Sequence, residues 1–208
     1  LHIGSFLAII TYFFKDLINF IKNRDLFIKI IISSIPVMVV GYLLVKYDLI
    51  YSLRNLKIIG WTTIIFGALL YVSDKFKINK KLDSNFNLKS AIFIGFFQIL
   101  ALIPGVSRSG ITITAARMLN FDRFDSAKIS FLLSIPTLAA VSFFGIKNLI
   151  ITGNLNFSVV NILSIILSFI FSFITIKYFL KFIKTFSLGV FVIYRVILGA
   201  TLLVIAYL

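Results

Sequence analysis

The chain has 208 residues, of which 60% are hydrophobic and 13% charged, and its mean hydropathy is +1.08. A soluble globular protein carries about 25% charged residues, so this composition excludes a water-soluble domain. The net charge is +14, but the basic residues lie between apolar runs, a pattern typical of membrane loops rather than of nucleic-acid binding. The absence of cysteine excludes disulfides and thiolate metal sites. We expect an all-α integral membrane protein with one polytopic domain over residues 1–208.

Apolar segments follow one another along the chain, at about 1–14, 27–45, 57–73, 88–119, 127–146, 157–176 and 187–208. A helix needs about 20 mostly apolar residues to cross a bilayer, so most of these segments are long enough. The first segment looks truncated, and the chain begins at Leu1 rather than at Met. We therefore expect that the natural protein begins earlier. No signal peptide is recognisable.

The fourth segment, 88–119, is interrupted by Pro104-Gly105 and by Arg108. Proline removes an amide donor and glycine permits backbone angles closed to other residues, so we expect two short helices joined by a turn. Each arm has about 15 residues and would measure about 23 Å, which is short of a hydrocarbon core of about 30 Å. The segment therefore predicts a re-entrant hairpin over 88–119.

The distribution of Lys and Arg supports a hairpin that returns to the side it left. With such a hairpin, fifteen basic residues fall on one face, and the other face keeps four, Lys46, Arg54, Lys57 and Lys147. If 88–119 crossed the membrane once, the division would be about ten to nine. Cytoplasmic loops carry the excess of basic residues, so we expect the hairpin to enter from the cytoplasm with its tip towards the outside.

A weak internal repeat has an offset of 100 residues. Asp25 matches Asp125, and the triplet Ser34-Ile35-Pro36 matches Ser134-Ile135-Pro136, each within an apolar helix. We interpret residues 1–87 as the remainder of a first repeat and residues 88–208 as a second repeat that contains the hairpin. Broken helices in repeated positions indicate a binding site near the middle of the membrane.

The polar residues of the hairpin predict an anion site. Arg108 is flanked by hydroxyl side chains at the expected start of a helix, where backbone amides and the helix dipole favour negative charge. The Arg side chain offers a two-pronged donor to phosphate or carboxylate. An alternative is that Arg108 only holds the turn, by pairing with a carbonyl or an Asp.

The run Pro104 to Gly110, PGVSRSG, together with Gly95–Gln98 and with Ser130–Pro136, strongly resembles the undecaprenyl-diphosphate phosphatase family, also known as bacitracin-resistance proteins. The resemblance covers nearly the whole chain. The first 17 residues are similar to the segment after the first re-entrant hairpin of the family, and Tyr194-Arg195 with Gly199 is similar to its C-terminal helix.

This resemblance implies an inverted-repeat helical bundle with two re-entrant hairpins, here with the first hairpin missing. It implies a multi-pass protein of the bacterial inner membrane that hydrolyses a polyprenyl diphosphate to the monophosphate, with a site open to the outer face. Arg108 would hold the diphosphate, and Ser107 would be nucleophile or donor. The substrate-binding residues carried over are Gln98, Gly105, Ser109, Gly110, Thr112 and Arg195.

One departure from the family concerns the chemistry of the site. The first hairpin of the family carries paired Glu residues, a Ser-rich turn and a His that supply acid–base and divalent-cation chemistry, and this chain has no Glu at all. A divalent cation, Mg²⁺ or Ca²⁺, is implied by the resemblance, but we expect no metal ligand in this chain and no activity from it alone. We expect membrane lipids and the polyprenyl diphosphate as partners, and no nucleic acid. The sequence leaves open whether the chain forms a homodimer.

Three other functions compete with this interpretation. A transporter or scramblase could bind an anionic lipid in the same arginine pocket without hydrolysing it, because broken helices in repeats are also common in transporters. A lipid phosphatase of the acid-phosphatase type would need a His after the Ser-Arg pair, and none follows Arg108. A purely structural membrane subunit is disfavoured by the polar hairpin.

Overall fold

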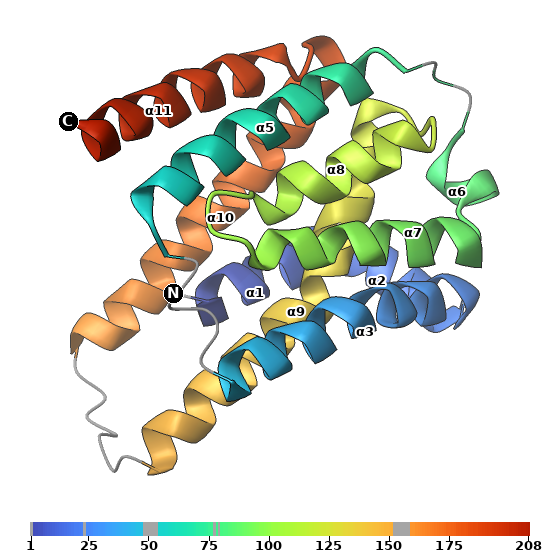
Figure 1. Ribbon diagram of the computed structural model, residues 1–208. Coiled ribbons are helices and arrows are strands. Elements are labelled where there is room, and N and C mark those ends of the chain that lie inside the picture. Colours follow the sequence, from blue (N-terminus) through green and yellow to red (C-terminus); the bar gives the residue numbers. More distant parts are fainter. Residues whose placement is uncertain (1, 23, 48–53, 77, 79, 152–158) are drawn as a thin grey trace.

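The computed structural model describes residues 2–22, 24–47, 54–76, 78, 80–151 and 159–208. Nearly all of these residues are helical (Figure 1). The helices are α1 (His2–Tyr12), α2 (Phe14–Lys22), α3 (Arg24–Lys46), α5 (Leu56–Asp74), α6 (Leu82–Asn85), α7 (Leu88–Ile99), α8 (Arg108–Met118), α9 (Arg123–Ile151), α10 (Val159–Thr185) and α11 (Gly189–Tyr207), with a 3-10 turn, η1 (Leu100–Leu102), after α7. Five of them, α3, α5, α9, α10 and α11, are long and apolar enough to cross a membrane, which confirms an all-α integral membrane protein.

Helix α10 is longer than the apolar segment 157–176 predicts, because it continues through three lysines to Thr185. The extension has two faces. Ile176, Leu180 and Ile183 are buried against the protein, while the lysines lie on the exposed face. Spacings of three and four residues place the buried side chains on one side of the helix. Hydropathy alone stops at the first lysine and so misses this amphipathic last part.

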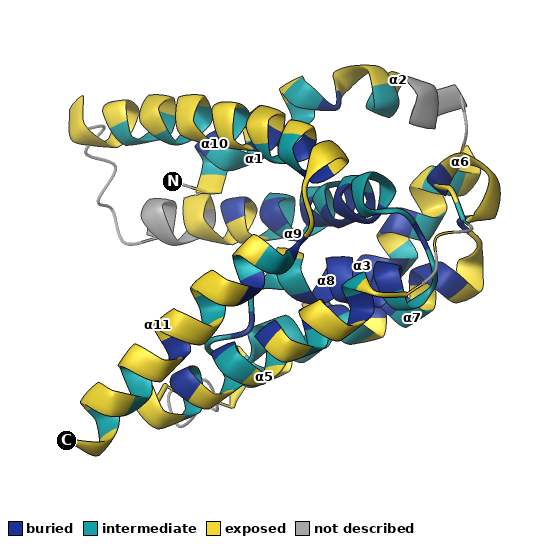
Figure 2. Cartoon of the chain, turned by 90° about the horizontal axis from the view of Figure 1, so that it is seen from above, coloured by how far each residue is buried: buried dark blue, intermediate teal, exposed yellow. Residues whose placement is uncertain are grey.

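The helices form a bundle with two outer pairs. Helices α5 and α11 pack together on one side and α1 and α10 on the other, while α7, α8 and α9 lie between them (Figures 1 and 2). Buried residues concentrate in the central helices, and the outward sides of α5, α10 and α11 are exposed (Figure 2). Those exposed sides are rich in Ile, Leu, Val and Phe, as expected of surfaces that face lipid.

The contact between α5 and α11 is made by small residues. A Cβ atom on Gly60 would lie 3.2 Å from the carbonyl oxygen of Gly199, and one on Gly199 would lie 2.9 Å from the carbonyl oxygen of Gly60. Helices in lipid gain stability mainly from close van der Waals packing, which glycines at the contact allow. The backbones of α5 and α11 therefore approach more closely here than larger side chains would permit.

Asp74, at the end of α5, joins several elements at one end of the bundle. Its carboxylate accepts two hydrogen bonds from Arg123, at 2.7 and 2.9 Å, and a third at 3.2 Å from the amide of Leu188 before α11. Arg117, at the end of α8, donates to the carbonyl oxygens of Asp74 and Phe76 at 2.9 and 2.8 Å. These bonds satisfy carbonyls that the end of α5 leaves without helical partners. We call this end, where α5 and α8 finish and α9 and α11 begin, the basic end.

The segment 88–119 enters and leaves the bundle at the basic end. The amide of Lys80, just before the hairpin, donates to the carbonyl of Asn120, just after it, at 3.2 Å. The turn between α7 and α8 meets α5 at Thr62, which lies twelve residues before Asp74 and six after Leu56. At 1.5 Å per residue, the tip is about 18 Å from the basic end and about 9 Å short of the start of α5. This is the geometry of a re-entrant hairpin.

The directions of the long helices alternate in two opposite sets. Helices α1 and α5 run towards the basic end and α3 runs away from it, whereas α9 and α11 run away and α10 runs towards it (Figure 1). The second set of three thus reverses the first. The residues that match at an offset of 100 lie instead on α3 and α9, which both run away from the basic end and touch where the hydroxyl oxygen of Ser34 lies 3.4 Å from the carbonyl oxygen of Leu133. That match alone therefore does not represent an inversion.

We expect Asp74→Ala to destabilise the protein by about 3 kcal/mol, because it leaves Arg117 and Arg123 without their carboxylate in a poorly hydrated site. Thermal unfolding of the purified protein in detergent measures the loss. Asp25→Ala is the matched control, since the Asp25 side chain is 71% exposed and pairs only with Lys29 on its own helix, so its removal changes stability by less than about 0.5 kcal/mol. Equal losses in the two variants would contradict the role given to Asp74.

The two ends of α5 test the orientation in the membrane. The chain has no cysteine, so Lys57→Cys and Lys75→Cys each supply a single thiol, at the start and just beyond the end of the same helix. Because the basic end carries most of the lysines, we expect it to face the cytoplasm by the positive-inside rule. A membrane-impermeant maleimide should label position 57 in intact spheroplasts and position 75 only after permeabilisation. The opposite pattern would reverse the topology. Lys147, near the end of α9, has a side chain outside the described residues.

Candidate functional site

The tip of the hairpin is held by two hydroxyls of α5. The side chain of Thr62 donates to the carbonyl of Pro104 at 2.7 Å, and the hydroxyl oxygen of Thr63, whose shorter bond is to Ile59 on its own helix, lies 3.3 Å from the carbonyl oxygen of Gly105. Gly105 has φ of +90°, and a Cβ atom there would lie 2.2 Å from the Thr62 hydroxyl oxygen. Non-helical backbone at membrane depth must find such partners within the protein. Gly105, expected among the binding residues, therefore forms the turn and packs against α5.

Ser107 is the N-cap of α8. Its hydroxyl oxygen accepts a hydrogen bond from the amide of Gly110 at 3.2 Å and lies 3.2 Å from the hydroxyl oxygen of Ser109. Arg108 is the first helical residue, and the positive end of the α8 dipole lies at this turn. The amides of a first helical turn have no partners within the helix and can bind an anion. The sequence expectation of a helix start at this motif is confirmed.

Arg108 is held by a hydroxyl of α9. Its Nη1 donates to Oγ1 of Thr137 at 2.6 Å, and that hydroxyl donates to the carbonyl of Ser134 at 3.0 Å. Thr137 is neutral and orients the guanidinium without cancelling its charge. Every described acidic residue lies towards the basic end, on the far side of the bundle from the tip: Asp16, Asp25, Asp74, Asp83, Asp122 and Asp125. Asp48 is outside the described residues. The alternative in which a described Asp pairs with Arg108 is thus not seen.

Arg195 brings a second guanidinium to the same turn. It comes from α11, and a Cβ atom on Gly110 would lie 3.2 Å from its Nη2 and 3.4 Å from its Cζ. Its stem passes Gly67 of α5, where a Cβ atom would lie 3.2 Å from the Cβ of Arg195. The close packing of α5 and α11 therefore places this cation against the first turn of α8. The turn that Arg108 begins is therefore in contact with a second arginine from a distant part of the sequence.

Thr112 and Gln98 occupy different environments. Thr112 is 1% exposed, and its hydroxyl lies 2.7 Å from that of Ser130, so it joins α8 to α9. Gln98, near the end of α7, is fully buried, and neither its Oε1 nor its Nε2 has a hydrogen-bond partner among the described residues. A buried amide normally finds partners, and one that lacks them is a candidate to bind a ligand or water.

Thr137 and the Thr62–Thr63 pair escaped the sequence analysis. A signal for Thr137 was available, because Ser130, Ser134 and Thr137 are spaced by four and three residues and so share one face of α9. That polar face lies against α8, where it meets Thr112 and Arg108. No sequence pattern of this kind distinguishes Thr62 and Thr63, because their hydroxyls contact backbone carbonyls that are distant in sequence.

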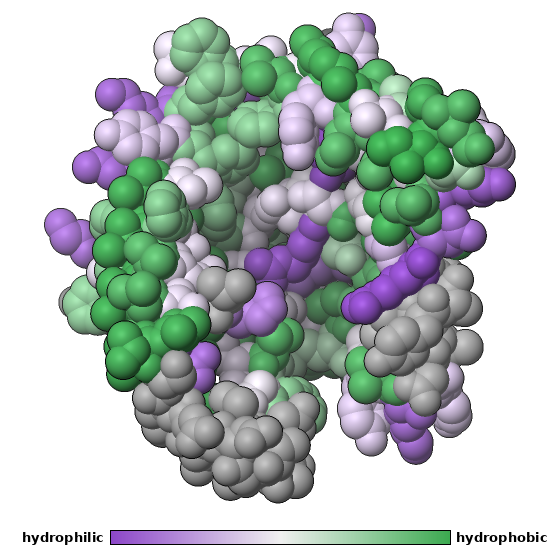
Figure 3. Space-filling view, turned by 90° about the vertical axis from the view of Figure 1, so that its left-hand side faces the viewer, coloured by the Kyte–Doolittle hydropathy of each residue, from purple (hydrophilic) through white to green (hydrophobic). Residues whose placement is uncertain are grey.

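The end of the bundle opposite the basic end is hollowed. Figure 3 looks onto this end and shows hydrophilic surface in the recessed middle, with hydrophobic side chains around it. Within the described residues, no three His, Cys, Asp or Glu side chains gather as a metal site. The polar groups at the tip are guanidinium, hydroxyl and amide groups, which suit an anion.

Comparisons with known proteins agree with this chemistry. A family model described as bacitracin resistance protein BacA matches residues 1–201. An undecaprenyl-diphosphatase of Pelagibacter ubique (strain HTCC1062) is 53% identical over 209 residues, which cover 100% of this chain and 81% of the relative. Proteins of the same name from Jannaschia sp. (strain CCS1) and Aliivibrio salmonicida (strain LFI1238) are 37% and 38% identical, over 99% and 97% of this chain and 82% and 80% of theirs. The chain therefore belongs to the BacA family of bacitracin resistance proteins.

Proposed function

We propose that this chain is an undecaprenyl-diphosphatase, a hydrolase that converts undecaprenyl diphosphate to the monophosphate and releases phosphate. The names of its relatives and its family support this activity. The observation that carries the proposal within the chain is that the first turn of α8 begins with Arg108 and has the guanidinium of Arg195 packed against Gly110. An arginine inside a membrane costs about 2.5–3.5 kcal/mol to insert. Two arginines at one turn are therefore better explained by a functional role than by a structural one.

The diphosphate would be bound at the start of α8. A guanidinium can donate two parallel hydrogen bonds to phosphate oxygens, and the amides of the first turn add further donors. Thr137 fixes the direction of Arg108, and Gly110 leaves room for Arg195. Both cations are in place before the substrate arrives, so charge that develops on phosphate oxygens would be stabilised without reorganisation of the site.

For Ser107 we propose the role of a donor. Its oxygen already accepts from the amide of Gly110 as the cap of α8, which leaves its proton to donate to a phosphate oxygen or to Ser109. A serine nucleophile would need a general base within hydrogen-bond reach. No such base contacts Ser107 among its hydrogen bonds in the described residues.

A divalent cation, which phosphoryl transfer commonly uses, does not fit the residues at this turn. Mg²⁺ and Ca²⁺ prefer carboxylate oxygens, the chain has no Glu, and the described Asp residues lie towards the basic end. The residues at the tip would bind and orient the diphosphate, and we assign them no step that involves a cation.

The position of the site also indicates its side of the membrane. Its binding groups lie beyond the middle of the bundle, about 18 Å from the basic end by the length of α5, and the hollow opens at the opposite end (Figure 3). If the basic end faces the cytoplasm, the site opens to the outer face of the bacterial inner membrane. We therefore propose that the substrate reaches it from the outer leaflet.

Arg108 provides the test of this function. We expect Arg108→Ala to weaken binding of undecaprenyl diphosphate and to lower phosphate release at least 100-fold, because the removed donors stabilise the reacting phosphate. Arg108→Lys should remain impaired, since an ammonium keeps the charge but lacks the planar fork. Lipid binding by the purified chain in micelles is the deciding readout, because we expect no activity from this chain alone, and release of inorganic phosphate is measured separately. Lys57→Ala, at the exposed start of α5, is the control. Unchanged binding in Arg108→Ala would refute the assignment.

The second arginine gives an independent prediction. If Arg108 and Arg195 bind the same diphosphate, Arg195→Ala should weaken lipid binding, and the loss in the double variant should differ from the sum of the two single losses by at least about 0.5 kcal/mol. A double-mutant cycle of dissociation constants measures this coupling. Strict additivity would place the two cations on different ligands.

A further inference from the structure

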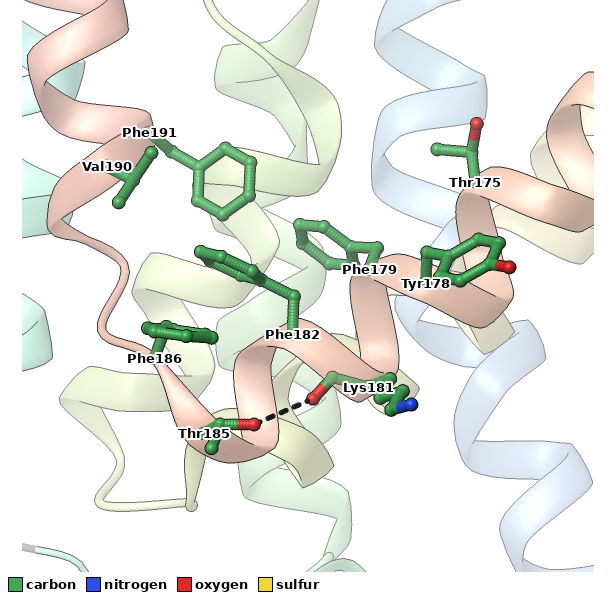
Figure 4. Close-up of a pocket in the computed structure, with 9 residues that line it drawn as sticks. All are labelled: Thr175, Tyr178, Phe179, Lys181, Phe182, Thr185, Phe186, Val190 and Phe191. Carbon is green, nitrogen blue, oxygen red and sulfur yellow. Dashed lines mark hydrogen bonds between the residues drawn. The ribbon is translucent and has the colours of Figure 1, made fainter.

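A surface hollow of about 620 Å³ lies where α10 turns into α11, and its lining residues include neither arginine of the tip (Figure 4). We call it the elbow groove. Five aromatic side chains and one lysine make up most of its lining: Tyr178, Phe179, Phe182, Phe186, Phe191 and Lys181. The volume falls within the range of about 300–1,000 Å³ that is usual for small-molecule sites.

The groove exists because its two helices separate after the turn. Helix α10 packs against α1, whereas α11 packs against α5, so the two diverge from Leu188 onwards (Figure 2). Phe191 fills the narrow end, with ring centroids 5.3 Å from Phe179 and 5.8 Å from Phe182. The wider part stays open, and there Tyr178 and Phe186 are 63% and 55% exposed.

The groove lies at one end of the spanning helices, where we expect hydrocarbon to meet headgroups. The amide of Leu188, in the same turn, is bonded to the carboxylate of Asp74, which places the elbow at the basic end. Tyrosine and lysine are typical of this boundary, because each has an apolar body and a polar tip. A ligand here would meet aromatic rings on its apolar side and basic groups on its polar side.

The lysines beside the groove have no acidic partner among the described residues. Lys177, Lys181 and Lys184 are exposed and are spaced by four and three residues, so they lie along one side of α10. Among the ion pairs of the described residues, none involves these three; Lys184 instead lies over the ring of Phe124, 4.3 Å from its centroid. Three unneutralised cations next to an apolar hollow are complementary to an anionic headgroup that carries an acyl chain.

We propose that the elbow groove binds an anionic phospholipid of the leaflet at the basic end. The headgroup phosphate lies at Lys177 and Lys181, and an acyl chain lies along Phe182 and Phe186. This site is separate from the proposed diphosphate site at the hairpin tip and does not depend on hydrolysis there. Since the elbow is tied to Asp74, a lipid bound in it also supports the junction of α5, α9 and α11.

A single tryptophan can report on the groove. The chain has one Trp, Trp61 on α5, so the variant Trp61→Phe with Phe186→Trp carries its only indole in the groove. The purified protein in neutral detergent is titrated with brominated phosphatidylglycerol or brominated phosphatidylcholine, whose bromines quench a nearby indole. We expect half-maximal quenching by the anionic lipid at a concentration roughly tenfold lower than by the zwitterionic lipid.

Charge variants locate the preference. Lys177→Gln with Lys181→Gln should abolish the difference between the two lipids, while Lys46→Gln with Lys57→Gln, which removes the same charge at the other end of the bundle, should preserve it. Trp61 in the unaltered chain, 51% exposed on α5, should show no such difference. Val190→Trp in the Trp61→Phe background is the second reporter if the Phe186 variant fails to fold.

Two results would overturn the proposal. One is equal quenching by the two lipids, or a preference that survives the loss of Lys177 and Lys181. The other is displacement of the quencher by undecaprenyl phosphate but not by unbrominated phosphatidylglycerol, which would assign the groove to a prenyl chain instead.

Discussion

The helical arrangement depends on one requirement. Backbone N–H and C=O groups that have no helical partner inside a membrane must find hydrogen-bond partners elsewhere in the protein. The turn after α7 leaves the carbonyls of Pro104 and Gly105 without helical partners. The hydroxyls of Thr62 and Thr63 on α5 lie within hydrogen-bond distance of these two carbonyls. Without them, the hairpin would carry unsatisfied carbonyls into hydrocarbon at a cost of several kcal/mol. Because the tip is fixed on α5, the first turn of α8 is also fixed, and with it the directions of its amides.

Helix α5 is therefore the reference for both ends of the hairpin. Its middle holds the tip, and its last residue, Asp74, is tied to Arg117 at the end of α8. The same helix receives α11 through Gly60 and carries the stem of Arg195 past Gly67. The second cation of the site is thus placed by helix packing, while the first is placed by the hairpin. Neither arginine therefore depends, among the described residues, on an acidic partner at the site for its position.

The sequence predicted what depends on local pattern. Pro104-Gly105 marked the break, the lysine distribution indicated its return to the same side, and the PGVSRSG run located the cap of α8. Contacts between distant segments were not predictable, because no periodicity says that Thr62 serves Pro104 or that Arg195 meets Gly110. The last part of α10 was missed for a different reason. Hydropathy averaged along the sequence does not detect a helix that is apolar on one side only. The roles of the site residues remain predictions.

The reversed directions of the two sets of three helices bear on how the protein is inserted during synthesis. Turning the whole protein over in the membrane would bury the same apolar helices. Apolar length therefore does not choose between the two orientations, and charge has to do so. Most lysines lie at the basic end, so the positive-inside rule predicts that they set the orientation during insertion and, with it, the leaflet from which a ligand reaches the arginine site.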